Sequence, residues 1–247
     1  GINIDFENVY DDDKDRLTSF VAKLADRLRE QRVVVSIDAT VPSGVPMWSN
    51  CYDRPALGKL VDYFMVMTYD EHWRTSPVAG SVASIGWVER GIVNTLQSVP
   101  KEKLLMGVPF YTREWRESDN ERVRSSTMWM ADVENRVARY NLKPQWLPAA
   151  GQHYIEYGDG EYRYKVWIED EKSLALKAEL AQKYNLAGVA AWRKGFEKPG
   201  IWNAVHVALG KTVEANASVA AESSMTNWSL KAIMAKMKGA AGEGTSE

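Results

Sequence analysis

The feature that most constrains the fold is a set of five apolar, largely β-branched runs separated by stretches of helical periodicity. The runs are Ile2–Phe6, Val33–Ala39, Tyr63–Tyr69, Leu104–Tyr111 and Gly188–Trp192. Such runs are typical of strands buried on both faces of a parallel sheet. Between the first two, Leu17, Val21 and Leu24 lie on one face of a predicted helix. Further helices are predicted near 87–99, 172–184 and 201–209. This alternation predicts an α/β fold with a parallel sheet.

The connection between the fourth and fifth runs is too long for a loop and one helix. Residues 128–140 within it have a helical pattern. Two strand-like segments, Tyr154–Tyr157 and Glu161–Trp167, flank Gly158-Asp159-Gly160, which is a hairpin signal. We therefore expect an α+β insertion within residues 112–187. The main domain spans residues 1–210, and residues 211–247 are rich in Ala, Ser and Gly, which predicts a flexible tail.

Composition excludes several classes of function. The net charge of −2 does not favour nucleic acid or an anionic membrane. No apolar run approaches the ~20 residues that span a bilayer, so we expect no membrane insertion. Cys51 is the single cysteine, and His72, His153 and His206 lack metal-ligand spacing. We expect no metal, no cofactor and a monomer.

Two carboxylates, Asp5 and Glu7, alternate at the end of the first predicted strand. With a period of two, both side chains point to the same face, with Cα atoms ~6.6 Å apart. Two acids in a confined site repel each other, so one keeps its proton and can act as a general acid. By itself this pattern is more often a solvated strand end.

The residues around the pair form a recognisable signature. Gly1-Ile2-Asn3-Ile4-Asp5-Phe6-Glu7-Asn8 resembles the catalytic signature of glycoside hydrolase family 18, Asp-Gly-x-Asp-x-Asp-x-Glu, without its leading Asp. Three further segments resemble family strands in order and spacing. They are Met67-Thr68-Tyr69-Asp70, Gly107-Val108-Pro109-Phe110-Tyr111 and Gly188-Val189-Ala190-Ala191-Trp192. The resemblance is strongest to the chitinase-like branch that acts on spore cortex and cell wall, an N-acetylglucosaminidase branch.

The resemblance implies a fold. Family members have a (β/α)8 TIM barrel with the signature on strand four, so the five runs would be strands 4 to 8. The insertion would lie between strands 7 and 8. An intact barrel takes ~250 residues without insertions. We therefore expect an N-terminally truncated, partial barrel, and a chain that is insoluble, molten or inactive when alone.

The resemblance also implies a mechanism. Glu7 would protonate the glycosidic oxygen, and the 2-acetamido group of the substrate would act as nucleophile, as in family 18 generally. Asp5 would bind the acetamido N–H, and Tyr69 the acetamido oxygen. Asn3 stands where the family pattern usually has Asp. A neutral amide cannot share a proton with Asp5, so the pH profile should differ from the common one.

Further side chains are candidates for binding sugar. Trp192 would form the floor of the sugar site, and Tyr111, Trp73 and Trp115 could stack on sugar rings. Asp70 and Arg113 could bind hydroxyl groups, although a surface ion pair is an equally good interpretation of Arg113.

These observations predict a retaining glycosidase that cleaves β-1,4 bonds in an N-acetylglucosamine-containing polysaccharide, either chitin or peptidoglycan. The alternatives are a non-catalytic glycan-binding relative and an inactive fragment of the enzyme. The presence of Glu7 argues against the non-catalytic glycan-binding alternative, since such relatives usually lose that residue. The expected location is outside the cell, secreted or associated with the cell wall or spore, with any targeting segment outside this chain.

Overall fold

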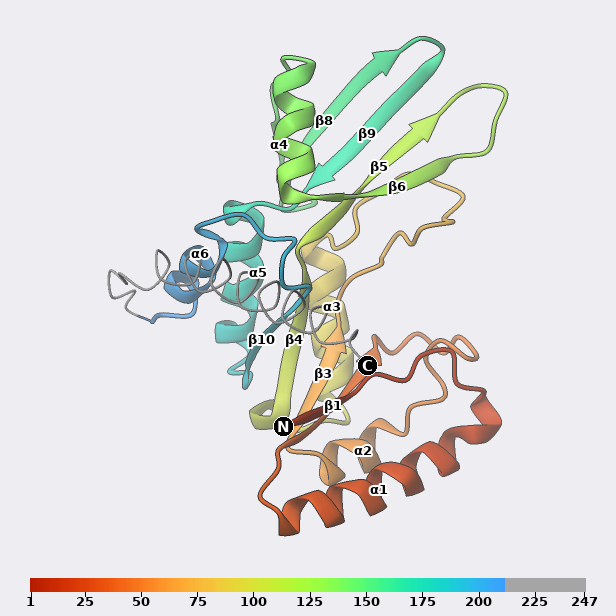
Figure 1. The fold of residues 1–247 in the computed structure, drawn as a ribbon, viewed down its shortest axis with the longest axis vertical. Helices are drawn as coiled ribbons and strands as arrows, with labels where there is room; N and C mark the ends of the chain where they lie inside the picture. The colour runs from red at the N-terminus through yellow and green to blue at the C-terminus, as the bar shows by residue number, and fades with distance from the viewer. Residues whose placement is uncertain (212–247) are drawn as a thin grey trace, which may run out of the picture. The chain divides into compact units, whose positions relative to one another are not determined.

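The predicted strands form one parallel sheet in the computed structural model, which describes residues 1–211 of the chain (Figure 1). The order is β1-β2-β3-β4-β10, and every neighbouring pair is parallel. The strands are β1 (Ile2–Ile4), β2 (Val35–Thr40), β3 (Tyr63–Met67), β4 (Leu104–Pro109) and β10 (Gly188–Trp192). The parallel α/β prediction is therefore confirmed as a half-barrel sheet.

Helices cover one face of this sheet and bury its apolar side chains. They are α1 (Lys14–Glu30), α2 (Arg54–Leu60), α3 (Ile85–Leu96), α5 (Glu171–Lys183) and α6 (Ile201–Ala208), with short 3₁₀ turns η1 (Asp11–Asp13) and η2 (Lys101–Lys103). Ile4, Ile37 and Phe64 from three adjacent strands pack with residues of α1 and α2. Since side chains alternate along a strand, the residues between them point to the opposite face. That opposite face holds Asn3 and Asp38.

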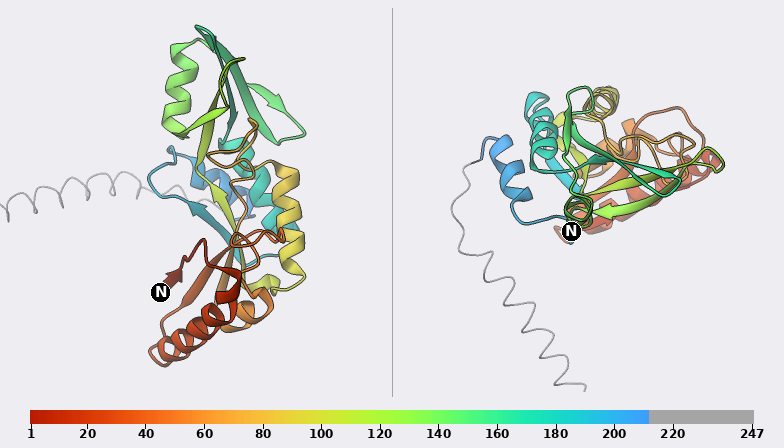
Figure 2. Two further views of the ribbon diagram at one scale, coloured as in Figure 1. Left: turned by 90° about the vertical axis from the view of Figure 1, so that its right-hand side faces the viewer. Right: turned by 90° about the horizontal axis from the view of Figure 1, so that it is seen from above.

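A second sheet follows β4 in the chain. It is antiparallel, in the order β6-β5-β9-β8-β7. Its elements are β5 (Tyr111–Glu117), β6 (Arg124–Trp129), α4 (Met130–Arg139), β7 (Gln145–Leu147), β8 (Gln152–Asp159) and β9 (Tyr162–Ile168). It stands beyond the end at which the parallel strands terminate (Figures 1 and 2). An α+β unit therefore follows β4, from Tyr111 in β5 to Ile168 in β9.

Several boundaries differ from the sequence prediction. The hairpin turn is at Gly160 and Glu161, because Asp159 already pairs with Tyr162, and Gly160 takes the positive φ of 65°. Met128 lies in β6 rather than in the helix that follows. The helix α2 was not predicted, since its seven residues are too few to show a period. Asp53 caps it by accepting a hydrogen bond from the Ala56 N–H at 3.0 Å.

The first strand is shorter than predicted. β1 pairs with β2 from Ile2 to Ile4 only, so Asp5 and Glu7 follow the strand instead of lying within it. Because β1 has a partner on one side only, its hydrogen bonding as a strand ends where β2 diverges from it. The two acids nevertheless remain at the carboxyl end of β1, where the prediction needed them.

Two expectations concern other parts of the chain. The tail predicted at residues 211–247 lies outside the described residues, apart from Lys211. Among residues 1–211, no helix combines the length and the apolar character that crossing a bilayer requires.

Candidate active site

The carboxyl ends of the parallel strands meet around a small cavity of ≈130 Å³. β1, β3 and β10 each bring residues to it, and β5, which continues β4, brings Tyr111. The lining residues are Asp5, Glu7, Met67, Tyr69, Asp70, Tyr111 and Trp192. Six of the ten residues singled out from the sequence therefore line one cavity. Of the others, Asn3 donates a hydrogen bond to Asp38, and Arg113 donates one to the lining residue Asp70.

Glu7 has the electrostatic environment that a proton donor needs. Burial raises the pKa of its carboxyl above the usual value, and the nearby charges of Asp5 and Asp70 raise it further. Desolvation and like charge both disfavour the anion, so the proton is held to higher pH than on a free glutamate. Such a group can donate a proton near neutral pH.

A third carboxyl lies close to the pair, and the sequence analysis missed it. Asp38 on β2 accepts a hydrogen bond from Asn3 Nδ2 at 2.8 Å, while Ser36 Oγ donates to Asn3 Oδ1 at 2.6 Å. Asp38 is 5% exposed. Burial, opposed by the Asn3 hydrogen bond and assisted by the charges of Asp5 and Glu7, raises its pKa to about 6. The available signal was one acidic residue within an apolar run predicted to be a buried strand.

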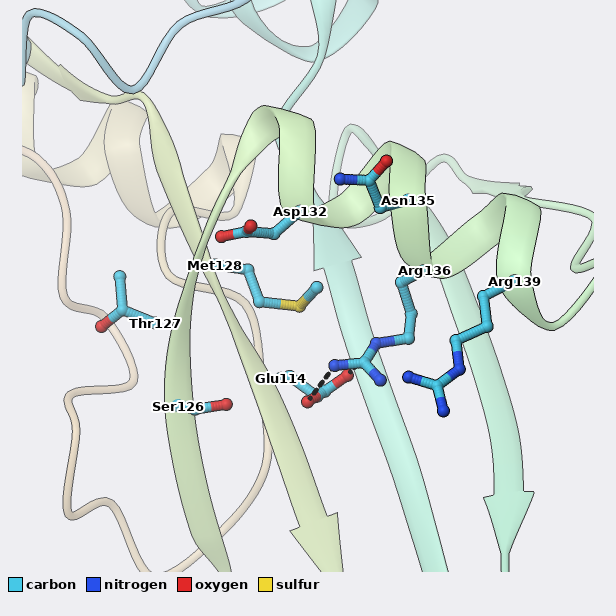
Figure 3. A pocket seen from close by; sticks show the side chains of 8 residues that line it. All are labelled: Glu114, Ser126, Thr127, Met128, Asp132, Asn135, Arg136 and Arg139. Atoms are coloured by element: carbon cyan, nitrogen blue, oxygen red, sulfur yellow. Dashed lines mark hydrogen bonds and ion pairs between the residues drawn. The ribbon is translucent and has the colours of Figure 1, made fainter.

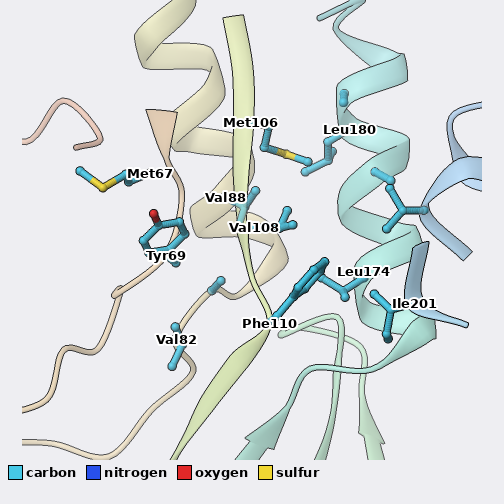
Figure 4. Packing of buried hydrophobic residues seen from close by; sticks show 14 of the residues in the cluster. Met67, Tyr69, Val82, Val88, Met106, Val108, Phe110, Leu174, Leu180 and Ile201 are labelled. Carbon is cyan, nitrogen blue, oxygen red and sulfur yellow. The ribbon is translucent and has the colours of Figure 1, made fainter. Parts of the chain in front are cut away.

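Tyr69 is nearly buried, with its ring against Gly107. A Cβ on Gly107 would lie 3.2 Å from Tyr69 Cε1 and 2.9 Å from the Val66 carbonyl oxygen. Only glycine leaves room for the ring at this position. Burial, followed by the charges of Asp38 and Asp5, raises the pKa of the Tyr69 hydroxyl, so it remains a donor. Figure 4 shows Tyr69 beside Met67, across β4 from Leu174 and Leu180.

Asp70 organises the side of the cavity next to the second sheet. Its Oδ1 accepts hydrogen bonds from the Tyr111 hydroxyl at 2.7 Å and from an Arg113 guanidinium nitrogen at 3.1 Å. Arg113 is therefore a partner of a cavity residue and not a member of an exposed surface pair. Asp70 takes a positive φ of 61°. Backbone outliers of this kind often occur at functional sites.

The aromatic candidates separate into exposed and buried residues. Trp192 is 44% exposed and lines the small cavity. Trp115 is wrong as a sugar-stacking candidate, because it is fully buried and its indole N–H donates to the Gly80 carbonyl at 2.8 Å. Trp73 lines a neighbouring cavity of ≈590 Å³ that also reaches Glu7, Asp70 and Arg113. Two other tryptophans there, Trp48 and Trp87, had no signal in the sequence.

Another hollow, of ≈260 Å³, lies between α4 and strands β5 and β6 (Figure 3). Its floor carries Glu114, whose carboxylate pairs with Arg136 at 2.8 Å and also accepts the Tyr157 hydroxyl. No residue predicted for the active site lines it. Within residues 1–211, no group of three or more His, Cys, Asp or Glu side chains is placed to hold a metal ion.

Comparisons with known proteins agree with the geometry. Residues 1–196 match the family described as "Glycosyl hydrolases family 18". Over 211 residues the chain is 29% identical to YvbX of Bacillus subtilis (strain 168), described as an uncharacterized glycosylase. Over 208 residues it is 26% identical to the cortical fragment-lytic enzyme of the same organism. These matches cover 83% and 81% of this chain.

A solved structure gives the same result. The chitinase of Chromobacterium violaceum ATCC 12472 superposes with a TM-score of 0.78 and 29% identity, covering 86% of this chain and 67% of that one. The chain spans 60% of YvbX and 48% of the cortical fragment-lytic enzyme, so roughly half of such relatives' length is matched.

Proposed function

The chain belongs to glycosyl hydrolases family 18, and we propose that it carries the catalytic residues of a retaining, substrate-assisted glycosidase. The observation that carries this proposal is the gathering of Asp5, Glu7, Tyr69, Asp70, Tyr111 and Trp192 around one cavity. These residues come from four separate segments of the chain. A purely structural arrangement would not require two carboxyls beside an exposed tryptophan.

The proposed reaction starts with proton transfer. Glu7 donates its proton to the glycosidic oxygen as the bond to the anomeric carbon breaks, and the 2-acetamido oxygen attacks that carbon. The resulting oxazolinium ion is positively charged, and Asp5 stabilises it from the acetamido N–H side. Tyr69 donates a hydrogen bond to the acetamido oxygen and aligns it for attack. Glu7, now ionised, takes a proton from water, which opens the oxazolinium with retention of configuration.

The surroundings support these assignments. The raised pKa of Glu7 suits the acid, and the raised pKa of Tyr69 keeps its hydroxyl as a donor. Asp70, bonded to Tyr111 and Arg113, is held in a fixed orientation for sugar hydroxyls. Trp192, with its exposed ring, offers an apolar face for the C–H side of the bound sugar.

We propose an N-acetylglucosamine-containing glycan as substrate, because the mechanism requires a 2-acetamido group. Chitin and peptidoglycan both meet this requirement. The similarity to a cortical fragment-lytic enzyme favours peptidoglycan and a location at the cell wall or spore.

The central test is Glu7→Gln in the intact protein. Turnover of an N-acetylglucosamine oligomer should fall by about 10²–10⁴-fold, the usual contribution of general acid catalysis, while binding survives. Glu121→Gln, on the exposed β5–β6 connection, is the matched control and should leave turnover unchanged. Near-normal turnover of Glu7→Gln would remove Glu7 as the acid.

A second test separates the enzyme from a glycan-binding protein and addresses the stereochemistry. Proton NMR of the anomeric signals should show that the first product formed is the β-anomer. A thiazoline analogue of N-acetylglucosamine should inhibit the reaction. Initial appearance of the α-anomer would contradict the internal nucleophile. Binding without any product from the unmodified intact protein would favour the non-catalytic alternative.

A further inference from the structure

The larger cavity at the strand ends, with a volume of ≈590 Å³, shares Glu7 and Asp70 with the small one. Asp5, Tyr69 and Trp192, which contact the acetamido-bearing sugar in the proposed mechanism, line the small cavity alone. Glu7 protonates the oxygen between that sugar and the leaving group. The leaving group therefore extends past Glu7 into the larger cavity, whose volume suits a small ligand. The inference drawn from this cavity rests on the proposed function and deepens it.

The wall of the larger cavity combines apolar surface with a cation that has no anionic partner. Trp48 and Trp73 supply aromatic surface, and Arg74 belongs to the same lining. The other arginine of this cavity, Arg113, is paired with Asp70 at 3.1 Å. Arg74 is exposed, and within residues 1–211 no carboxylate lies at ion-pair distance from its guanidinium. The cavity therefore offers one positive charge that the described part of the chain does not neutralise.

The turn that carries Arg74 is anchored to the second sheet. Ser125 Oγ on β6 donates a hydrogen bond to the Arg74 carbonyl oxygen at 2.8 Å. The turn is also closed on itself, because the Ser76 N–H donates to the Trp73 carbonyl at 2.9 Å and the Trp73 indole N–H donates to Thr75 Oγ1 at 3.1 Å. The backbone of Arg74 is thus held in place while its guanidinium keeps all its donors for a ligand.

The acids of the larger cavity are committed to other partners. The two carboxylate oxygens of Glu71 accept from the Ser84 N–H at 2.8 Å and from Ser84 Oγ at 3.0 Å, at the start of α3. Asp70 accepts from its own two partners. Burial and like charge raise the pKa of Glu7, which favours its neutral form. A guanidinium such as that of Arg74 can then bind an external carboxylate through two parallel N–H···O hydrogen bonds.

We propose that Arg74 binds a carboxylate carried by the leaving-group sugar. Chitin consists of neutral N-acetylglucosamine and has no such group. In peptidoglycan every second sugar is N-acetylmuramic acid, whose lactyl ether ends in a carboxyl that is either free or linked to a peptide with carboxylates of its own. Arg74 is therefore a specificity residue: it favours peptidoglycan over chitin, and it selects the bond in which N-acetylglucosamine occupies the small cavity and N-acetylmuramic acid leaves.

The experiment measures kcat/KM of the intact protein on three tetrasaccharides. They are a peptide-free oligomer of alternating N-acetylglucosamine and N-acetylmuramic acid, its carboxyl methyl ester, and chitotetraose. The unmodified protein should prefer the acid to its ester by about 5–20-fold, between the effects of an exposed ion pair and of a charge-assisted hydrogen bond. It should prefer the acid to chitotetraose as well. Arg74→Gln should bring the acid-to-ester ratio close to one, and Arg74→Lys, which keeps the charge without the planar fork, should retain part of it.

The ratio compares two substrates of one variant, so a general loss of folded enzyme cancels from it. Arg122→Gln, at an exposed position between β5 and β6 that lines neither cavity, is the matched control and should change neither the ratio nor the turnover. A peptide-bearing oligomer and its methyl ester distinguish the two sources of the carboxylate. A preference that appears only with this pair, and is lost in Arg74→Gln, assigns the carboxylate to the peptide.

The position of cleavage is a second readout. Borohydride reduction and mass spectrometry should identify N-acetylglucosamine at the new reducing ends. New reducing ends at N-acetylmuramic acid would put the carboxylate on the wrong side of Glu7 and overturn the proposal, as would equal kcat/KM on acid and ester with and without the peptide, or a ratio that survives Arg74→Gln. Full activity of Glu7→Gln would sink the proposed function itself, whereas a Glu7-dependent enzyme indifferent to the carboxylate would sink only this inference.

Discussion

At the scale of single residues, the site holds more negative charge than its surroundings neutralise. The charges of Asp5 and Glu7 act on Asp38, and Arg113, which contacts the cavity residue Asp70, is already paired with it. Such charge is unfavourable to the fold and useful for proton transfer, and this exchange of stability for activity is common at active sites. Individual substitutions can separate the two effects.

Asp38→Asn should stabilise the folded protein in a pH-dependent way. A rise in carboxyl pKa from 3.8 to about 6 means that ionised Asp38 costs the native state about 3 kcal/mol at pH 8. This cost develops as pH rises from about 4 to about 6, because the unfolded chain ionises first. Urea unfolding should show a gain of about 1–3 kcal/mol at pH 8 and none at pH 4. An equal difference at both pH values would contradict the ionisation argument.

The pair between Asp70 and Arg113 should matter for stability as well as binding. The Arg113 side chain is 7% exposed, and that of Asp70 is 28% exposed. Asp70→Asn leaves the arginine without its anion, which should cost about 1.5–3 kcal/mol of unfolding free energy. The control is Asp119→Asn, whose partner Arg163 is 60% exposed, with an expected change within about 0.5 kcal/mol. Similar losses in the two variants would show that burial of the pair is irrelevant.

At the scale of elements, a buried polar cluster joins α5 to the second sheet and to the loop before α3. Lys177 on α5 donates to both oxygens of Glu169, at 3.0 and 2.9 Å, directly after β9. Gln152 at the start of β8 donates to Glu169 at 2.7 Å and accepts from Ser81, in the loop before α3. The loop that follows Asp70 is thereby tied to the second sheet and to α5. This loop supplies Glu71, Trp73 and Arg74 to the lining of the larger cavity.

Lys177→Met tests this cluster. The substitution leaves Glu169 buried and without its cation, and breaking such a pair usually costs about 3–5 kcal/mol. The comparable exposed pair is Lys183 with Glu89, at 2.7 Å with the lysine 60% exposed, and Lys183→Met should cost less than about 1 kcal/mol. Chemical denaturation measures both. Adding Glu169→Leu to Lys177→Met should recover much of the loss, and its failure to do so would assign the loss to packing.

At the scale of the whole molecule, both edges of the parallel sheet are open within residues 1–211. β1 pairs only with β2, and β10 pairs only with β4. Unpaired edges invite pairing with another chain. Ile2 on β1, 44% exposed, adds apolar surface at one of these edges. The half-barrel therefore brings the carboxyl ends of its strands together while leaving its backbone ladder incomplete.

The 247-residue chain, produced on its own, should self-associate. Light scattering after size exclusion should give a mass that rises with concentration, and Ile2→Lys should lower it, since a charged residue on an edge strand opposes pairing. Val93→Lys, at a similarly exposed position on α3, is the control and should have no effect. A constant monomer mass across concentrations would show that the open edges are harmless.

The sequence by itself determined the five parallel strands, most of the helices between them and the position of Asp5 and Glu7 at the end of the first strand. The strands depend on local pattern, because burial on two faces gives continuous apolar runs. The recurring motifs identified the family. Local patterns could also locate Tyr69, Asp70 and Trp192, because the first two follow β3 closely and the third ends β10.

Tertiary structure alone decided which distant residues share an environment. Asp38 meets Asn3 across 35 positions, and Arg113 meets Asp70 across 43. Trp115 is buried and donates to the Gly80 carbonyl, whereas Trp192 keeps an exposed ring, although both are tryptophans in strands. Periodicity assigns a residue to a face, but the register between strands and the packing of loops decide what that face meets. Burial, hydrogen bonding and pKa depend on those long-range contacts, so they had to be seen in the fold.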